Sequence, residues 1–189
     1  MALNNDEYLN NMSDLLGDIE TYVRVDRDPT KKRINELHNM VLKWKNCEYI
    51  SLANYRHLNC TDGILPRAYG LPKIHKPNCP LRVIISSIGT PLHPLATFLH
   101  KILVKSLPKA NSYIKNSFDL VEKLTDNHID GNNHRLISLD VISLFTNVPI
   151  ELVVNSIEKR WIHIKNECAL PKDEFLVVVR FILNSTFFF

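Results

Sequence analysis

The sequence predicts an α+β fold with a helix-rich N-terminus, and three features of its 189 residues support this prediction. Apolar residues recur at helical spacing towards both ends of the chain. A proline-rich region lies between them, and prolines at this density exclude a long helix there. Within that region, residues 81–86 have the apolar, β-branched composition of a strand. With 45% hydrophobic residues, a chain of this length can bury a core of its own.

Helices are expected before and after the proline-rich region. From Asp6 to about Trp44 the spacing of apolar residues predicts two helices joined through residues 28–30, and their apolar faces favour a packing role. A later helix is expected to begin at Ser117, which is a suitable N-cap. The helices predicted by the same spacing further along the chain cover residues 92–105, 117–124, 149–161 and 173–183.

Three further segments are expected to have little helix. Residues 73–80 are basic and are expected to form a loop or hairpin tip that enters the strand at 81–86. Residues 136–141 follow the turn-like composition of 131–133, are mostly apolar, and are expected to form a short strand. Residues 186–189 have the composition of a strand that is just beginning.

The charges are segregated along the chain. Although the net charge is only +3, no acidic residue lies between Asp62 and Asp119, so the rest of the chain is net acidic. Eight basic residues in this stretch form what we call the basic block: Arg67, Lys73, Lys76, Arg82, Lys101, Lys105, Lys109 and Lys115. Such a block suits contact with a polyanion, because each cation that neutralises a phosphate releases condensed counterions. A solvated basic face is the alternative interpretation.

Other classes of protein fit the sequence poorly. The four cysteines are scattered without a CxxC pair, so neither a disulfide framework nor a zinc knuckle is expected, and an intracellular setting fits best. A secretion or transit signal is not expected either, because such a signal begins with basic residues followed by an apolar run, whereas the N-terminus contains Asp6 and Glu7. Residues 175–189 are the most apolar stretch, but polar residues interrupt it, and it is shorter than the roughly 20 residues that are needed to span a bilayer. No membrane partner is therefore expected.

Asp140 is the candidate catalytic residue. It stands near the end of the expected strand at 136–141, before a turn and an amphipathic helix, and a carboxylate held in this way can bind a divalent cation. The alternative is that Asp140 caps the turn or the following helix. Phe145 stands five residues further on, where an aromatic ring could form the floor of a nucleotide sugar pocket.

Six short motifs occur in order between about residues 64 and 150. They are PRAYGLPKIHKP at 66–77, PLR at 80–82, ISS at 85–87, YIKNSF at 113–118, SLDV at 138–141 and LFTNVP at 144–149. In order and spacing they closely resemble the fingers motifs and palm motif A of the reverse transcriptases of Penelope-like retroelements. Weaker similarity extends to residues 6–8 and 26–30 on one side and to 185–189 on the other.

The resemblance implies a partial right-hand polymerase, with fingers and the beginning of a palm. Its regions are a helical N-terminal region at 1–62, basic fingers at 63–130, and at 131–189 the start of a palm with motif A that stops before motif B. The implied activity is RNA-directed DNA polymerisation for a retrotransposable element, with an RNA template, a DNA primer and deoxynucleoside triphosphates as partners. The family's priming on chromosomal DNA implies a nuclear location.

The resemblance also implies roles for individual residues near motif A. Asp140 would bind both of two Mg²⁺ ions, which stabilise the attacking and leaving oxygens, and the backbone carbonyl of Val141 would assist. Phe145 occupies the place of the bulky residue that lies against the sugar 2′ position. Such a contact favours deoxynucleotides over ribonucleotides.

In the fingers, the resemblance implies a site for the incoming triphosphate. Arg82 matches the arginine that clamps this group, and a planar guanidinium suits bidentate phosphate binding. Either Lys73 or Lys76 would be the accompanying lysine, and their spacing does not decide between them.

The sequence lacks the motifs that the family carries further downstream. It has no glycine-containing motif B, no motif C with paired aspartates, no thumb and no GIY-YIG nuclease region. Since one carboxylate cannot hold two metal ions as three can, the chain alone is expected not to polymerise. The leading expectation is a fragment of a reverse transcriptase. A non-catalytic nucleic-acid-binding module and a pseudogene product are the alternatives.

Overall fold

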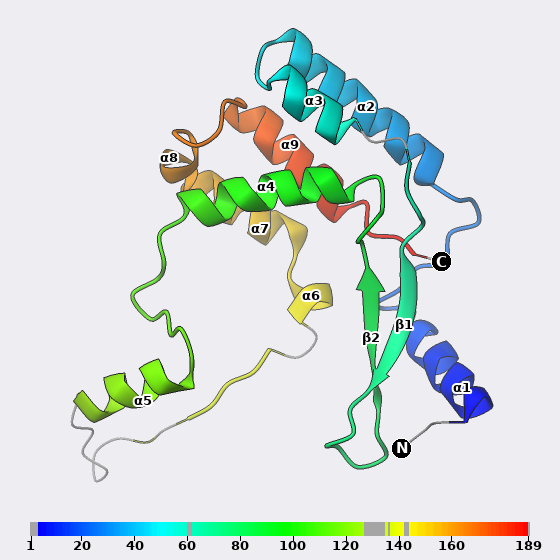
Figure 1. Cartoon of the computed structure of the whole chain (residues 1–189). Coiled ribbons are helices and arrows are strands. Elements are labelled where there is room, and N and C mark those ends of the chain that lie inside the picture. The colour runs from blue at the N-terminus through cyan, green and yellow to red at the C-terminus, as the bar shows by residue number, and fades with distance from the viewer. Residues whose placement is uncertain (1–3, 60–61, 127–134, 136, 142–143, 189) are drawn as a thin grey trace.

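The computed structural model shows a helical body from which a two-stranded hairpin projects (Figure 1). It describes residues 4–59, 62–126, 135, 137–141 and 144–188. The elements in chain order are α1 (Asn5–Leu16), α2 (Thr30–Asn46), α3 (Leu52–Leu58), β1 (Arg67–Pro72), β2 (Leu81–Ser86), α4 (His93–Ser106), α5 (Ser117–Asp126), α6 (Leu144–Asn147), α7 (Ile150–Lys159), α8 (Trp161–Ile164) and α9 (Lys172–Leu183). Over these described ranges no helix combines the length and apolar character needed to cross a membrane.

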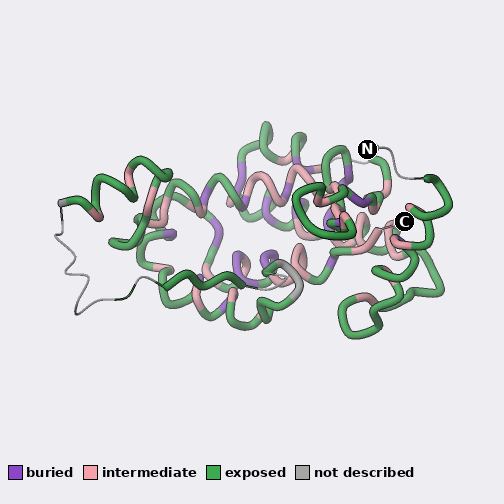
Figure 2. The backbone as a smooth tube through the Cα atoms, turned by 90° about the horizontal axis from the view of Figure 1, so that it is seen from below, coloured by how far each residue is buried: buried purple, intermediate pink, exposed green. Residues whose placement is uncertain are grey.

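A hydrophobic core joins the helices of the body. Leu37, Val41 and Trp44 of α2 have no exposed surface, and these are the positions that the helical spacing predicted. They belong to one cluster with Leu95 of α4 and Phe175 of α9. Helices from the N-terminal, middle and C-terminal parts of the chain therefore share one core. In Figure 2 the buried positions gather in the middle of the body, whereas α5 at one end is mostly exposed.

The N-terminal helices differ from the prediction in how they are joined. α1 already ends at Leu16, and residues 17–29 are not helical, so the expected direct junction at residues 28–30 is wrong. The expected start of α2 is confirmed. The Asp28 carboxylate accepts a hydrogen bond from the Thr30 N–H at 2.8 Å, and its bonds to the Thr30 hydroxyl and N–H lower the pKa of Asp28. One of the spare donors at the helix start is thereby satisfied.

The later helices largely follow the predicted spacing. The ranges of α4 and α9 confirm the helices expected at 92–105 and 173–183, and α7 ends at Lys159, so that Trp161 belongs to α8. α5 does begin at Ser117, but Ser117 is not its cap. The side-chain oxygen of Asn116 accepts the hydrogen bond from the Asp119 N–H at 3.0 Å, so the capping residue lies one position earlier than expected.

The hairpin contains one expected strand and one unexpected strand. β2 has the range that the sequence predicted, and residues 73–80 form the predicted tip, which is closed by the Lys73 N–H donating to the Pro80 carbonyl at 2.9 Å. β1 pairs with β2 in antiparallel register, with Arg67 opposite Ser86 and Leu71 opposite Arg82. Little in the sequence indicates β1, because the strand contains Gly70, follows Pro66 and ends at Pro72, and these residue types are typical of loops.

Two expected strands are absent from the described residues. Residues 137–141 have no strand structure, and Ile137 and Leu139 are 77% and 89% exposed. An apolar run becomes a strand only with a pairing partner, and in the described part of the chain β1 and β2 pair only with each other. Residues 186–188 are not a strand either, and the Phe188 ring instead meets Tyr22 edge-on at 5.7 Å.

The contact between α2 and α9 contains a carboxylate whose ionisation is linked to folding. Glu174 accepts hydrogen bonds from the Lys43 ammonium and, at 3.1 Å, from the Trp44 indole N–H. The Lys43 bond is the main reason that the pKa of Glu174 lies below its usual range, and burial opposes this shift. A lowered pKa means that the contribution to stability is present above the unfolded-state pKa, about 4.3, and is lost as the pH falls through the folded-state pKa.

We therefore expect the stability difference between wild type and Glu174→Gln to shrink on acidification. Wild type should be the more stable protein near neutral pH, and the two unfolding temperatures should converge as the pH falls from about 6 to 3. Thermal unfolding followed by circular dichroism across this range measures the effect. A difference that stays constant with pH would contradict it.

Candidate functional site

Arg82, Lys73 and Lys76 lie together on the hairpin. Arg82 belongs to β2, and both lysines belong to the tip between the strands. The Lys73 N–H closes the ladder against Pro80, and the Lys76 N–H donates to the Lys73 carbonyl at 3.0 Å, so the tip is a tight turn. Lys76 and Arg82 are exposed and Lys73 is half-buried. The structure thus groups the three residues for which the sequence predicted a phosphate-binding role.

The two faces of the hairpin differ in what covers them. Paired residues of an antiparallel ladder point to the same face, and successive residues alternate. One face includes Gly70 and Leu81, which are buried next to α1, and we call it the covered face. The register places six residues on the other face, which we call the open face: Arg67, Tyr69, Leu71, Arg82, Ile84 and Ser86.

The open face combines positive charge with an aromatic ring. Arg67 and Arg82 are exposed, and Tyr69 and Leu71 between them are 42% and 49% exposed. The arginines are offset by four positions along the strands, which corresponds to roughly 13 Å. That distance is about four nucleotide steps of 3.4 Å along one strand of a duplex.

The charges of the hairpin are not neutralised by the protein. Among the described residues, Arg67, Lys73, Lys76 and Arg82 take part in no ion pair. Other members of the basic block behave differently. Lys105 of α4 is paired with Glu167 at 2.5 Å, and the Lys109 ammonium lies 4.4 Å from the centre of the Tyr113 ring. The interpretation as a polyanion-binding surface therefore fits the hairpin better than it fits Lys105 and Lys109.

Sequence reasoning missed the position of Arg67 and Tyr69 on the open face. Arg67 was counted in the basic block, but nothing placed it on one face with Arg82, because that requires the register of a strand that was not predicted. The available signal was the alternation of Arg67, Tyr69 and Leu71 at every second position, which is typical of a strand with one functional face.

Asp140 and Val141 belong to a separate segment between α5 and α6. Asp140 is exposed and Val141 is 59% exposed, and neither is part of a strand. The stiff sheet on which the sequence placed Asp140 is therefore missing from the described structure. Phe145 belongs to α6, but its side chain lies outside the described residues, so its predicted position against a sugar stays a prediction.

The carboxylates do not gather into a metal site in the described part of the chain. No group of three or more histidine, cysteine, aspartate or glutamate side chains there could hold a metal ion. Asp140 and the Val141 carbonyl are too few oxygen ligands for the two Mg²⁺ ions that the sequence motifs imply. The described residues alone do not fit such a two-ion site.

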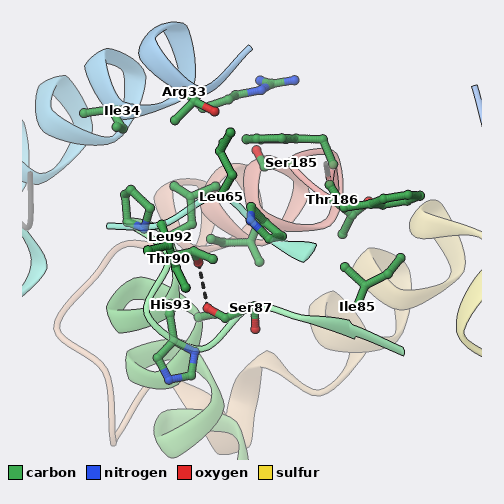
Figure 3. Close-up of a pocket in the computed structure, with 18 of the residues that line it drawn as sticks. Arg33, Ile34, Leu65, Ile85, Ser87, Thr90, Leu92, His93, Ser185 and Thr186 are labelled. Atoms are coloured by element: carbon green, nitrogen blue, oxygen red, sulfur yellow. Dashed lines mark hydrogen bonds between the residues drawn. The ribbon is translucent and has the colours of Figure 1, made fainter. Parts of the chain in front are cut away.

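A cavity of about 420 Å³ lies at the base of the hairpin (Figure 3). The start of α2, the end of β2, the first turns of α4 and residues 182–188 surround it. Its rim is ordered by the Thr90 hydroxyl, which donates to the Ser87 carbonyl at 2.7 Å. The described residues that line it are mostly apolar and include no carboxylate, so the cavity supplies no carboxylate ligand that could join Asp140 at a metal ion.

The hairpin can therefore bind phosphates, whereas Asp140 belongs to no group of three or more potential metal ligands among the described residues. The open face and the cavity are distinct, because the cavity is reached by Ile85, which belongs to the covered face. No protein-family model, curated protein or solved structure matches the chain.

Proposed function

We propose that the chain binds nucleic acid through the open face, as the fingers part of a reverse transcriptase of the Penelope-like type. The observation that carries the proposal is the pair Arg67 and Arg82 on one exposed face, with no ion-pair partner among the described residues. Tyr69 between them supplies a ring on which a base can stack. The order of the fingers motifs between residues 66 and 87 supports the same assignment.

The proposed ligands are an RNA template paired with a DNA primer, and an incoming deoxynucleoside triphosphate. Arg82 would form a bidentate contact with a phosphate, since its planar guanidinium matches two phosphate oxygens. Lys73 and Lys76 at the tip act as mobile point charges, and one of them would accompany Arg82 on the triphosphate. Because these contacts are electrostatic and not specific to one phosphate, we expect the same side chains to bind the phosphate backbone of the hybrid when no triphosphate is present.

In catalysis, this chain would contribute part of a metal site. Asp140 and the Val141 carbonyl are proposed to supply oxygen ligands to Mg²⁺, which when bound stabilises the attacking and leaving oxygens of nucleotidyl transfer. Phe145 is proposed to exclude a 2′-hydroxyl. The remaining carboxylates would have to come from outside the described residues.

A second candidate function is a non-catalytic nucleic-acid-binding module. It is favoured by the lack of a metal-binding group of three or more side chains around Asp140 in the described part of the chain. Because the chain alone is expected not to polymerise, the two candidates are separated by primer extension with a longer protein in which motifs B and C follow this chain. Loss of extension in its Asp140→Asn variant supports the polymerase, whereas unchanged extension supports a module without a catalytic role.

The test of the shared part of both candidates is a titration with a labelled RNA–DNA hybrid. We expect the affinity to fall roughly 100-fold between 50 and 200 mM salt, because four phosphate contacts each contribute a slope of about −0.9 to the dependence of log K on log salt concentration. Fluorescence anisotropy measures this directly. Absence of binding, or an affinity that does not change with salt, would overturn the proposal.

A further inference from the structure

α1 supports the hairpin from its covered face. The Gly70 N–H donates to the Tyr8 hydroxyl at 2.8 Å, and Met12 is only 7% exposed. A Cβ atom on Gly70 would lie 2.6 Å from the Met12 Sδ and 2.9 Å from a methyl carbon of Leu81. The absence of a side chain at Gly70 is therefore what lets α1 approach the strands so closely.

The hairpin needs such support. An isolated two-stranded hairpin is at best marginally stable in water, and packing against a helix is one of the ways to stabilise it. Here the hairpin projects from the body, and α1 lies beside it (Figure 1). The Gly70 N–H that binds Tyr8 lies on a strand whose only sheet neighbour in the described residues is β2, so the bond also satisfies a donor at a sheet edge.

The charges of the N-terminal arm complement those of the hairpin. Residues 4–23 contain no lysine or arginine and five acidic residues: Asp6, Glu7, Asp14, Asp18 and Glu20. The hairpin that α1 contacts carries only basic charges. Opposite charges attract over about 8–10 Å at ordinary salt concentrations, so this difference favours the docked position of α1.

We propose that Tyr8 is a positioning residue for the open face. Its hydroxyl holds the outer edge of β1 while Met12 packs on the covered face, so that Arg67 and Arg82 on the open face meet a phosphate backbone at the same time. Gly70 is paired with Val83, the residue next to Arg82, so movement of β1 at Gly70 displaces both arginines relative to each other. The binding consequence rests on the proposed function, whereas the contact between α1 and β1 does not.

Tyr8→Phe tests this role because it removes only the hydroxyl oxygen. We expect exchange of the Gly70 amide hydrogen to accelerate roughly 2- to 12-fold, the range that corresponds to one hydrogen bond, and the affinity for the RNA–DNA hybrid to fall by a similar factor. The unfolding temperature of the body should change little, since Met12 and Tyr8 are not members of the core cluster. A role in overall stability alone would instead lower that temperature and leave affinity and salt dependence unchanged.

The matched control is Tyr55→Phe, the same change on α3, which lies on the far side of the body from the hairpin tip (Figure 1). It should leave both the Gly70 exchange rate and the hybrid affinity unchanged. Met12→Ala, measured in the same way, should weaken hybrid binding as Tyr8→Phe does. If Gly70 exchange does not respond to Tyr8→Phe, or if it responds while affinity stays the same, the positioning role is overturned. Arg82→Ala tests the proposed function separately. If hybrid affinity falls in Arg82→Ala but not in Tyr8→Phe, only the positioning role of Tyr8 is overturned. Unchanged hybrid affinity in Arg82→Ala overturns both the positioning role and the proposed function.

Discussion

Replacing Lys73, Lys76 and Arg82 together with alanine is expected to weaken hybrid binding by roughly 150- to 2,000-fold, because two or three charge-assisted hydrogen bonds of about 1.5 kcal/mol each are lost. The dependence of log K on log salt concentration should become shallower by about 2 to 3, since two or three fewer phosphates are neutralised. Lys76 and Arg82 are exposed and none of the three residues has an ion-pair partner among the described residues, so their removal leaves no buried charge behind. Anisotropy titrations at several salt concentrations measure both quantities.

The control for this triple variant removes three positive charges from the helical body. Lys45, Lys159 and Lys165 are exposed and lie outside the hairpin, so their joint replacement with alanine gives the same change in net charge. Its effect on affinity should be several-fold at most, since long-range charge effects are screened at physiological salt. Equal losses in both triple variants would contradict a localised site. The single variants Lys73→Ala and Lys76→Ala then show which lysine reaches a phosphate.

The helices could be predicted because their apolar spacing is a local signal. Leu37, Val41 and Trp44 are spaced for one helical face, and that face is the one buried. β2 was also predictable, since four of its six residues, all except Arg82 and Ser86, are apolar. In these segments, local preference and tertiary packing agree.

β1 shows where local preference fails. Gly70 weakens a strand by itself, and Pro66 before the strand and Pro72 at its end are typical of a loop. The segment is nevertheless a strand, because it pairs with β2 and because Tyr8, 62 positions earlier in the chain, satisfies its outward N–H. No local pattern contains either contact. The opposite failure occurs at 137–141, where composition favours a strand and no partner strand is present among the described residues.

The candidate site was predictable residue by residue but not as a surface. The charges of Lys73, Lys76 and Arg82 and their likeness to fingers motifs could be read from the sequence. Their association with Arg67 and Tyr69 depends on the register of the hairpin, in which one residue of slip would move every side chain to the other face. The role of Asp140 depends on carboxylates brought together in space, which the described residues do not show.

Replacing Trp44 with alanine is expected to lower the free energy of unfolding by about 3–5 kcal/mol, the usual cost of removing a large aromatic side chain from a core. Trp44 has no exposed surface, and its indole N–H donates to Glu174, so the variant loses both packing and a hydrogen bond between α2 and α9. Urea unfolding followed by circular dichroism measures the loss. A change below about 1 kcal/mol would show that the core does not depend on this contact.

The half-buried second tryptophan provides the comparison for that variant. Trp161 lies 5.5 Å from the Phe175 ring but keeps part of its surface in solvent, so Trp161→Ala should destabilise less than Trp44→Ala.

Because Trp44 belongs to the body and the open face belongs to the hairpin, hybrid affinity at a temperature where the Trp44→Ala variant remains folded should match wild type. Together with Tyr8→Phe, for which we expect weaker binding at nearly unchanged stability, this separates the two parts of the molecule. The body would determine whether the chain folds, and α1 would determine how the hairpin presents its charges. A loss of affinity in folded Trp44→Ala would instead show that the body core also positions the hairpin.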